Sequence, residues 1–232
     1  MTLADNLAAV RQRIDRACDD HGRDRSEVRL LPVSKTVDAE AVRQAYAAGV
    51  RTFGENRVQE VKQKAEALAD LADLRWAVIG PLQTNKAKVV AELAHEFHAL
   101  DSVRVAEALD KRLRTAGRTL EVLIQVNSSG EDTKSGLPPE RVVEFAAGLA
   151  DFSHVQVRGL MTLAANSTDR SEVEACFVRM AELREQLRGT EGLPGTYEEL
   201  SMGMSGDFEL AIAHGSTCVR VGTAIFGARP PV

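Results

Sequence analysis

The sequence has few cysteines, no long apolar run and none of the short motifs typical of common nucleotide-binding or hydrolytic enzymes. Its 232 residues include three cysteines, at positions 18, 176 and 218, and no CxxC pair. This spacing predicts neither a disulfide framework nor a zinc site. No GxSxG, GxGxxG or P-loop motif is present, so serine hydrolases, dinucleotide-binding folds and P-loop enzymes are not indicated.

Charge and hydropathy exclude further classes. The net charge is −5, from 29 basic and 34 acidic residues, and no basic block suggests binding to a nucleic-acid backbone. Residues 1–20 lack the apolar core of a signal peptide and are typical of an amphipathic helix. No apolar run is long enough to span a membrane, and the five histidines show no metal-ligand spacing. We therefore expect a cytoplasmic protein without metal, nucleic acid or membrane as a partner.

What the sequence does contain is a regular alternation of short β-rich segments with helical patterns. The eight predicted strands cover residues 28–34, 51–54, 74–79, 97–100, 120–126, 155–161, 197–201 and 218–225. Several are continuously apolar, which is typical of parallel strands covered on both faces. Besides the N-terminal helix, the predicted helices cover residues 39–48, 58–71, 86–95, 103–116, 139–150, 171–187 and 207–214.

Eight strands alternating with helices favour an α/β fold, a single (β/α)8 TIM barrel, over an open doubly wound sheet. The open sheet stays an alternative, because strand counts from one sequence often err by one or two. No linker or repeat divides the chain, so residues 1–232 are predicted to form one domain. Only FGARPPV follows the eighth strand. We therefore expect no helix there, and we expect the N-terminal helix to occupy that place on the barrel wall.

Small and polar residues follow each predicted strand, at the barrel face where active sites lie. Lys35 directly follows the apolar segment LLPVS. Partial burial lowers the pKa of an amine and makes it nucleophilic, so this side chain is suited to form a Schiff base with an aldehyde. The alternative is an ordinary lysine that pairs with a carboxylate or points to water, which from position alone is the commoner case.

Two glycine-rich segments predict a phosphate site. SMGMSGDFELAI, residues 201–212, leads from the seventh strand into a short helix, and RVGTAIFG, residues 220–227, adds a second Gly-Thr turn. Barrels frequently bind phosphate with the loops after strands seven and eight. Each segment alone is also compatible with ordinary turns. Arg220 either points inward, where it can donate a hydrogen bond to a ligand ring, or forms a salt bridge on the barrel wall.

Seven segments, in order along almost the whole chain, resemble the pyridoxal phosphate (PLP) homeostasis proteins, the PLP-binding proteins of the YggS/PROSC type. They are LLPVSKT (30–36), FGENRVQE (53–60), IGPLQTNK (79–86), VNSSGEDTKSGL (126–137), RGLMT (158–162), LSMGMSGDFELAI (200–212) and GSTCVRVGTAIFG (215–227). Each motif alone is unspecific, but the combination is highly specific. One departure is Ala77, which follows Trp76 where the family often has a histidine.

The resemblance implies a barrel like the N-terminal domain of alanine racemase, without that enzyme's C-terminal β-domain. It also implies PLP as the cofactor, held as a Schiff base on Lys35. Arg220 would face the pyridine nitrogen, and a permanently charged arginine cannot easily deliver a proton there, so the ring would be a poor electron sink. Met161 would help to line the pocket. The cofactor-binding residues implied in this way are Lys35, Asn56, Met202, Ser205, Arg220, Gly222 and Thr223.

The implied function is intracellular vitamin B6 homeostasis without classical catalysis, and PLP-dependent apoenzymes are candidate partners. A PLP-dependent amino-acid racemase is the alternative. Two-base racemisation needs a second base, and the only tyrosines are Tyr46, in a predicted helix, and Tyr197, at the far end of the seventh strand. A third alternative, a Schiff-base aldolase that uses Lys35 on a sugar phosphate, conflicts with the family motifs. Without a dimerising domain, the protein is expected to be a monomer.

Overall fold

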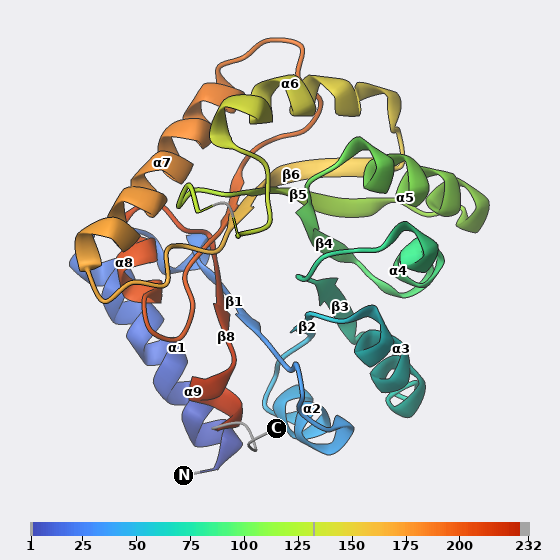
Figure 1. Ribbon diagram of the computed structural model, residues 1–232. Coiled ribbons are helices and arrows are strands. Elements are labelled where there is room, and N and C mark those ends of the chain that lie inside the picture. Colours follow the sequence, from blue (N-terminus) through green and yellow to red (C-terminus); the bar gives the residue numbers. More distant parts are fainter. Residues whose placement is uncertain (1, 132, 228–232) are drawn as a thin grey trace.

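Eight parallel strands form the centre of the fold in the computed structural model, which describes residues 2–131 and 133–227 (Figure 1). The strand order is β1-β8-β7-β6-β5-β4-β3-β2. A parallel bridge between Val33 and Gly54 connects the two end strands, so the sheet closes on itself. The predicted (β/α)8 barrel is confirmed. The strands are β1 (Arg29–Pro32), β2 (Thr52–Glu55), β3 (Arg75–Val78), β4 (Glu96–Leu100), β5 (Leu120–Val126), β6 (Val155–Thr162), β7 (Glu199–Ser201) and β8 (Cys218–Val221).

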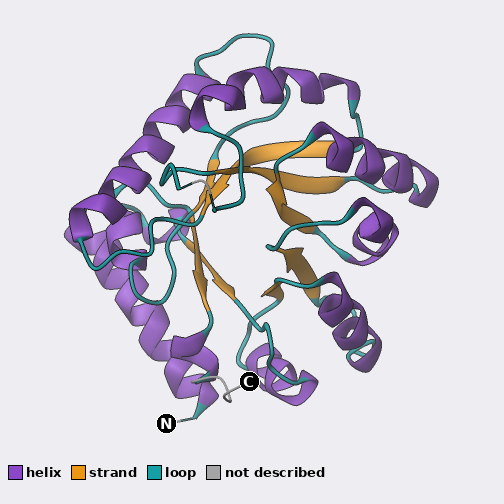
Figure 2. Ribbon diagram, in the orientation of Figure 1, coloured by secondary structure: helices purple, strands orange, loops and turns teal. Residues whose placement is uncertain are grey.

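The helices surround the strands (Figure 2). Local sequence explains their ends: Thr2 and Asp5 form a capping box at the start of α1, and Gly117 ends α5 at a φ of +63°. The α-helices of the described residues are α1 (Leu3–Asp20), α2 (Ala39–Ala47), α3 (Val58–Ala67), α4 (Ala87–Leu93), α5 (Val103–Ala116), α6 (Val142–Ala147), α7 (Arg170–Arg188), α8 (Phe208–Ala213) and α9 (Thr223–Phe226).

The end of the barrel differs from the sequence prediction. The eighth strand stops at Val221, and a short helix, α9, follows it, so the prediction of a strand to residue 225 with no helix after it is wrong. The physical reason is that Gly222 turns the chain, and its carbonyl accepts hydrogen bonds from the amides of Ile225 at 2.9 Å and Phe226 at 3.0 Å. Residues 228–232 of the predicted tail lie outside the described residues.

The N-terminal helix lies where it was expected. It packs against α2, α8 and α9 and so covers the wall next to β8 and β1 (Figure 1). The Asn6 side chain donates a hydrogen bond of 3.0 Å to the carbonyl of Ile225, which ties α1 to the residues that follow the last strand. Together, α1 and the short α9 take the place of a full eighth crossover helix.

Alternate residues of β1 point into the barrel and define its layers. Arg29 forms ion pairs with Glu96 and Glu199 at the amino end of the strands. Leu31 is fully buried in a small apolar cluster with Ala77 and Cys218. Ala77 therefore helps to fill the barrel interior. Val33 follows on the same face, and the next inward position is that of Lys35.

Candidate functional site

A pocket of about 1160 Å³ lies at the carboxyl ends of the strands. Its lining comes from the segments that follow β1, β2, β3, β5, β6, β7 and β8, together with residues near the ends of some strands. The sequence-predicted residues that it brings together are Lys35, Asn56, Ser205, Arg220, Gly222 and Thr223. This is the face at which (β/α)8 barrels place their sites.

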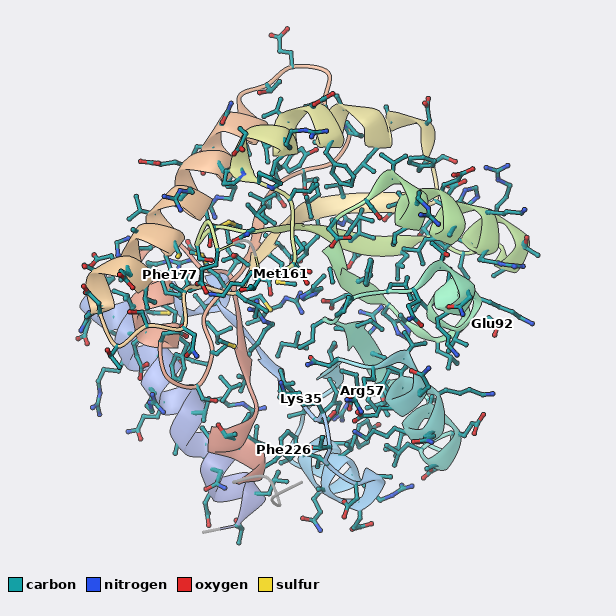
Figure 3. The ribbon with its side chains drawn as sticks, viewed as in Figure 1. Lys35, Arg57, Glu92, Met161, Phe177 and Phe226 are labelled. Atoms are coloured by element: carbon teal, nitrogen blue, oxygen red, sulfur yellow. The ribbon has the colours of Figure 1, made fainter. Side chains whose placement is uncertain are left out.

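Lys35 lies in a turn directly after β1, at the seam where the barrel closes. Its side chain is half-buried and lines the pocket together with that of Val33. The amide of Ser34 donates to the carbonyl of Gly54 at 3.0 Å, which continues the pairing of the two seam strands up to the turn. In Figure 3, Lys35 and Arg57 mark the two loops that follow β1 and β2. The position of Lys35 in the pocket agrees with the sequence prediction.

The loops after β7 and β8 line the pocket beside the turn of Lys35, because β8 pairs with β1. The hydroxyl of Thr223 lies 3.3 Å from that of Ser205, and the amide of Arg220 donates to the carbonyl of Gly203 at 3.0 Å. Gly203 has a φ of +94°, and a Cβ there would lie 2.7 Å from the side chain of Ala211, so only glycine suits this turn. Two hydroxyl groups and the flanking glycines thus face one region, which is suited to a phosphate group.

Arg220 points into the barrel rather than to the wall. Its side chain is buried and lines the pocket, and it donates hydrogen bonds of 2.7 Å to the hydroxyl of Ser201 and to the carbonyl of Thr162. Burial lowers the pKa of the guanidinium, but an arginine remains charged in proteins. The pocket floor therefore carries a fixed positive charge that is hydrogen-bonded to two uncharged oxygen atoms.

A chain of hydrogen bonds runs from Ser201 through the barrel to its amino end. His98 Nδ1 lies 3.2 Å from the Ser201 hydroxyl, and its Nε2 lies 2.7 Å from Glu96 Oε2. Arg29 then bridges Glu96 at 2.7 Å and Glu199 at 2.8 Å. Burial opposes ionisation of Glu96, but the contacts with His98 and Arg29 outweigh it and lower its pKa to about 2. We call this chain, formed by Ser201, His98, Glu96, Arg29 and Glu199, the relay. Sequence reasoning did not identify it.

The protonation states of the relay agree with one another. Burial lowers the pKa of His98, which favours the neutral imidazole. With Glu96 ionised, His98 Nε2 carries the proton and donates it, so Nδ1 accepts from the Ser201 hydroxyl. The Ser201 oxygen in turn accepts from Arg220. Every donor thus meets an acceptor along the buried chain.

Two predicted pocket residues are placed elsewhere. Met202 and Met161 are 0 % and 1 % exposed and belong to the hydrophobic core, and neither is among the residues that line the pocket. Met161 is paired in register with Gln125 and Ser201 inside the sheet. Met202 continues the pairing of β7 with β8 through its amide, which donates to the carbonyl of Cys218 at 3.1 Å. Both methionines are therefore part of the packed wall (Met161 is labelled in Figure 3).

The two tyrosines lie away from the pocket lining. The Tyr197 hydroxyl donates to the carbonyl of Pro194 at 2.7 Å, before β7 begins, and burial raises its pKa to about 12. The Tyr46 hydroxyl, on α2, is hydrogen-bonded to Asp73. Neither side chain is positioned to exchange a proton with a ligand in the pocket.

Sequence reasoning also missed one side of the pocket mouth. Residues 133–135 and 163–168 line it, and Lys134 joins the two segments by donating to the carbonyl of Ala164 at 2.9 Å. Lys134 also pairs with Glu131 at 2.7 Å. Two large apolar side chains at the mouth, Leu163 and Met204, are exposed. Loop segments without periodic patterns give no sequence signal for such placement.

Two negative findings hold for the described part of the chain. Within residues 2–131 and 133–227, no group of three or more histidine, cysteine or acidic side chains could hold a metal ion. Over the same residues, no helix combines the length and the apolar character needed to cross a membrane.

Comparison with solved structures shows close relatives of this fold. A protein of unknown function from Bifidobacterium adolescentis is 39 % identical, with a TM-score of 0.91 over 97 % of this chain and 94 % of that one. PipY from Synechococcus elongatus, in a structure with PLP bound, is 38 % identical, with a TM-score of 0.81 over 97 % of this chain and all of its own. Alanine racemase from Clostridium difficile, 15 % identical with a TM-score of 0.74, covers 99 % of this chain with 57 % of its own and shares the fold.

Sequence comparison gives the family. The model of the alanine racemase N-terminal domain matches residues 5–230. A protein from Pseudomonas aeruginosa named pyridoxal phosphate homeostasis protein is 44 % identical over 98 % of this chain and 96 % of its own. A protein of the same name from Escherichia coli is 42 % identical over 98 % of this chain and 97 % of its own. The chain belongs to the alanine racemase N-terminal domain family and, within it, to the pyridoxal phosphate homeostasis proteins.

Proposed function

We propose that this protein binds PLP as a Schiff base on Lys35 and serves vitamin B6 homeostasis, with residues 1–232 acting as one barrel domain. The observation that carries the proposal is the position of Lys35, which lines the same pocket as the loops of Ser205 and Thr223. The relatives named for PLP homeostasis and the PLP-bound structure of PipY support it.

The pocket residues fit the chemical groups of PLP, which supplies an aldehyde and a phosphate when bound. The Lys35 amine would hold the cofactor through its aldehyde, as a Schiff base. Ser205 and Thr223 offer hydroxyl donors to the phosphate, and Gly222 lets the backbone approach it closely. Asn56 lines the same pocket from the loop after β2 and is proposed to contact the cofactor. Met202 is not part of this proposal, because it lies in the core.

Binding without classical catalysis follows from two features of the pocket. Arg220 is proposed to face the pyridine nitrogen, and a permanent cation does not donate the proton that would make the ring a strong electron sink. Neither Tyr46 nor Tyr197 lines the pocket, so no tyrosine supplies the second base of a racemase there. The shared fold is thus the only feature that supports the racemase alternative, and a fold alone does not determine the reaction.

Borohydride reduction followed by peptide mass spectrometry tests the attachment site. The expected result is a phosphopyridoxyl group on the peptide that holds Lys35, and its loss in Lys35→Ala. Lys62→Ala, which removes an exposed lysine on α3, is the matched control and should label as the parent protein does. Labelling that is absent, or that persists in Lys35→Ala, contradicts the proposal.

Activity and assembly are tested on the same preparation. Incubation with L-alanine should give no racemisation above that of PLP bound to an unrelated lysine. Racemisation at a useful rate that Lys35→Ala abolishes would establish the alternative. We further propose that the protein is a cytoplasmic monomer that supplies PLP-dependent apoenzymes. Light scattering that gives a stable dimer would refute the monomer, and an apoenzyme activated no faster than by free PLP would refute the transfer.

A further inference from the structure

A cluster of polar and charged side chains, most of them buried, lies behind the turn that carries Lys35. We call it the seam cluster, and it consists of Ser34, Glu55, Glu60 and Lys64. The Lys64 ammonium lies 2.6 Å from the carbonyl of Ser34, 2.6 Å from Glu55 Oε1 and 3.6 Å from Glu60 Oε2. Lys64 is 7 % exposed and Glu55 is fully buried. None of the four side chains lines the pocket.

The seam cluster holds the backbone on both sides of Lys35. Before it, Ser34 is fixed through its hydroxyl, 2.6 Å from Glu55 Oε1, and through its carbonyl, which accepts from Lys64. After it, the amide of Thr36 donates to Glu60 Oε2 at 2.8 Å. Thr36 has a φ of +64°, a conformation that a β-branched residue adopts only when its surroundings impose it.

The seam cluster lies at a part of the barrel wall where the strands are sparsely paired. β1 pairs with β8 over four residues, and β2 likewise pairs with β3 over four residues. Between β1 and β2, the described residues show a single bridge, Val33 with Gly54. Side-chain contacts from α3 thus replace a strand ladder at the level of Lys35. Without them, the turn would have few constraints on its position.

Stability alone does not explain why these charges are buried. Taking an ion pair out of water costs as much as its attraction returns, and well-packed apolar side chains of similar volume often stabilise equally well. Glu55 Oε2 is buried without a hydrogen-bond partner in the described structure, which adds to the cost. Val58 and Val61, on the same buried face of α3, show that apolar residues suit this helix. A role in placing Lys35 accounts for the charge.

We propose that Lys64, acting through Glu55 and the backbone of Ser34, is a positioning residue that holds Lys35 in the geometry needed to form its Schiff base. The proposal rests on the proposed attachment of PLP to Lys35. Lys64 does not itself react with the aldehyde, because its ammonium is surrounded by oxygen acceptors and lies outside the pocket lining. Of these two neighbouring lysines, one is thus reactive and the other fixes its position.

The test compares PLP with an analogue that has a methyl group in place of the aldehyde, 4-deoxypyridoxine 5′-phosphate. The analogue makes the phosphate and ring contacts but cannot condense with a lysine. Lys64→Met should lower the rate of Schiff-base formation, followed by absorbance, about tenfold to a hundredfold, the effect expected when a reacting group is misplaced by about 1 Å. The affinity for the analogue should stay within about twofold of the parent value. Lys62→Met, on the exposed face of α3, should change neither quantity.

A second variant keeps the test decisive if Lys64→Met does not fold. Glu60→Gln leaves the buried contact of Lys64 with Glu55 intact and removes the charge that accepts from the amide of Thr36 and lies 3.6 Å from Lys64. It should slow Schiff-base formation about threefold or more at unchanged affinity for the analogue. If the variants that fold condense with PLP at the parent rate, or lose affinity for PLP and analogue equally, the positioning role is refuted. A parent protein that shows no label on Lys35 refutes the proposed function instead.

Discussion

The sharpest stability prediction concerns Ser201, the residue that joins Arg220 to the relay inside the barrel. Its hydroxyl accepts from the Arg220 guanidinium at 2.7 Å and lies 3.2 Å from His98 Nδ1. Ser201→Ala removes both contacts without changing the backbone and leaves a buried cation with one fewer acceptor. Arg220 keeps its second hydrogen bond, to the carbonyl of Thr162. The variant should therefore fold, with a lower free energy of unfolding.

The expected loss follows from the two contacts. A hydrogen bond to a charged group contributes about 1.5–3 kcal/mol, and one between neutral groups about 0.5–1.5 kcal/mol. Their sum predicts a decrease of about 2–4.5 kcal/mol in the free energy of unfolding. For a domain of this size, each kcal/mol lowers the thermal midpoint by about 2–4 °C, so the midpoint should fall by roughly 4–18 °C.

Urea denaturation followed by circular dichroism measures the loss directly. Ser216→Ala is the matched control, since Ser216 is equally buried and its hydroxyl donates to a neutral acceptor, the carbonyl of Met202, at 2.7 Å. The control should cost about 1 kcal/mol. If Ser201→Ala costs no more than Ser216→Ala, the relay does not stabilise Arg220 and the reasoning fails. Labelling of Lys35 should persist in Ser201→Ala, because Ser201 has no contact with the seam cluster.

Three further predictions use other parts of the structure. Burial lowers the pKa of His98 from its usual 6.5, so below that pH the unfolded chain binds more protons than the folded one. The contribution of neutral His98 to the free energy of unfolding should thus be fully present above pH 6.5 and decrease as the pH falls toward 5. His98→Asn should flatten this dependence in urea titrations between pH 5 and 7. Ser205→Ala should weaken binding of PLP about tenfold but leave binding of pyridoxal, which has no phosphate, unchanged in equilibrium titrations; equal losses for both ligands would contradict a phosphate contact. All three cysteines are buried, so a thiol reagent should titrate them only after unfolding; rapid reaction of the native protein would be inconsistent with the core as described.

The sequence allowed the fold to be predicted because strand and helix patterns are local. Continuous apolar runs bounded by turns marked the strands, and the order of elements implied a barrel. Lys35 was a candidate for the same reason, since it directly follows an apolar segment, but the family motifs were needed to distinguish it from an ordinary lysine and to indicate the other site residues. The end of β8 was misjudged, because VGTAIF is apolar enough for a strand and only the turn at Gly222 distinguishes it from a helix.

The two buried networks could not be predicted, because each depends on strand register and helix packing. His98 and Ser201 are 103 positions apart, and Arg29 and Glu199 are 170 apart. No periodicity relates such residues until the sheet has closed. Lys64 stands four positions after Glu60 on α3, a spacing typical of an exposed ion pair. It is buried only because this face of α3 covers the seam between β1 and β2.

The two networks lie on opposite sides of the barrel wall and share no residue. The seam cluster lies outside the barrel wall, between the strands and α3, and fixes the backbone of Lys35. The relay lies inside the barrel and fixes the side chain of Arg220 from below. A fully buried layer of Leu31, Ala77 and Cys218 lies between the ion pairs of Arg29 and the level of Lys35. Independent sites that share no partner act additively on stability. The backbone of Lys35 and the cation at the pocket floor are therefore held separately, so loosening one leaves the other in place.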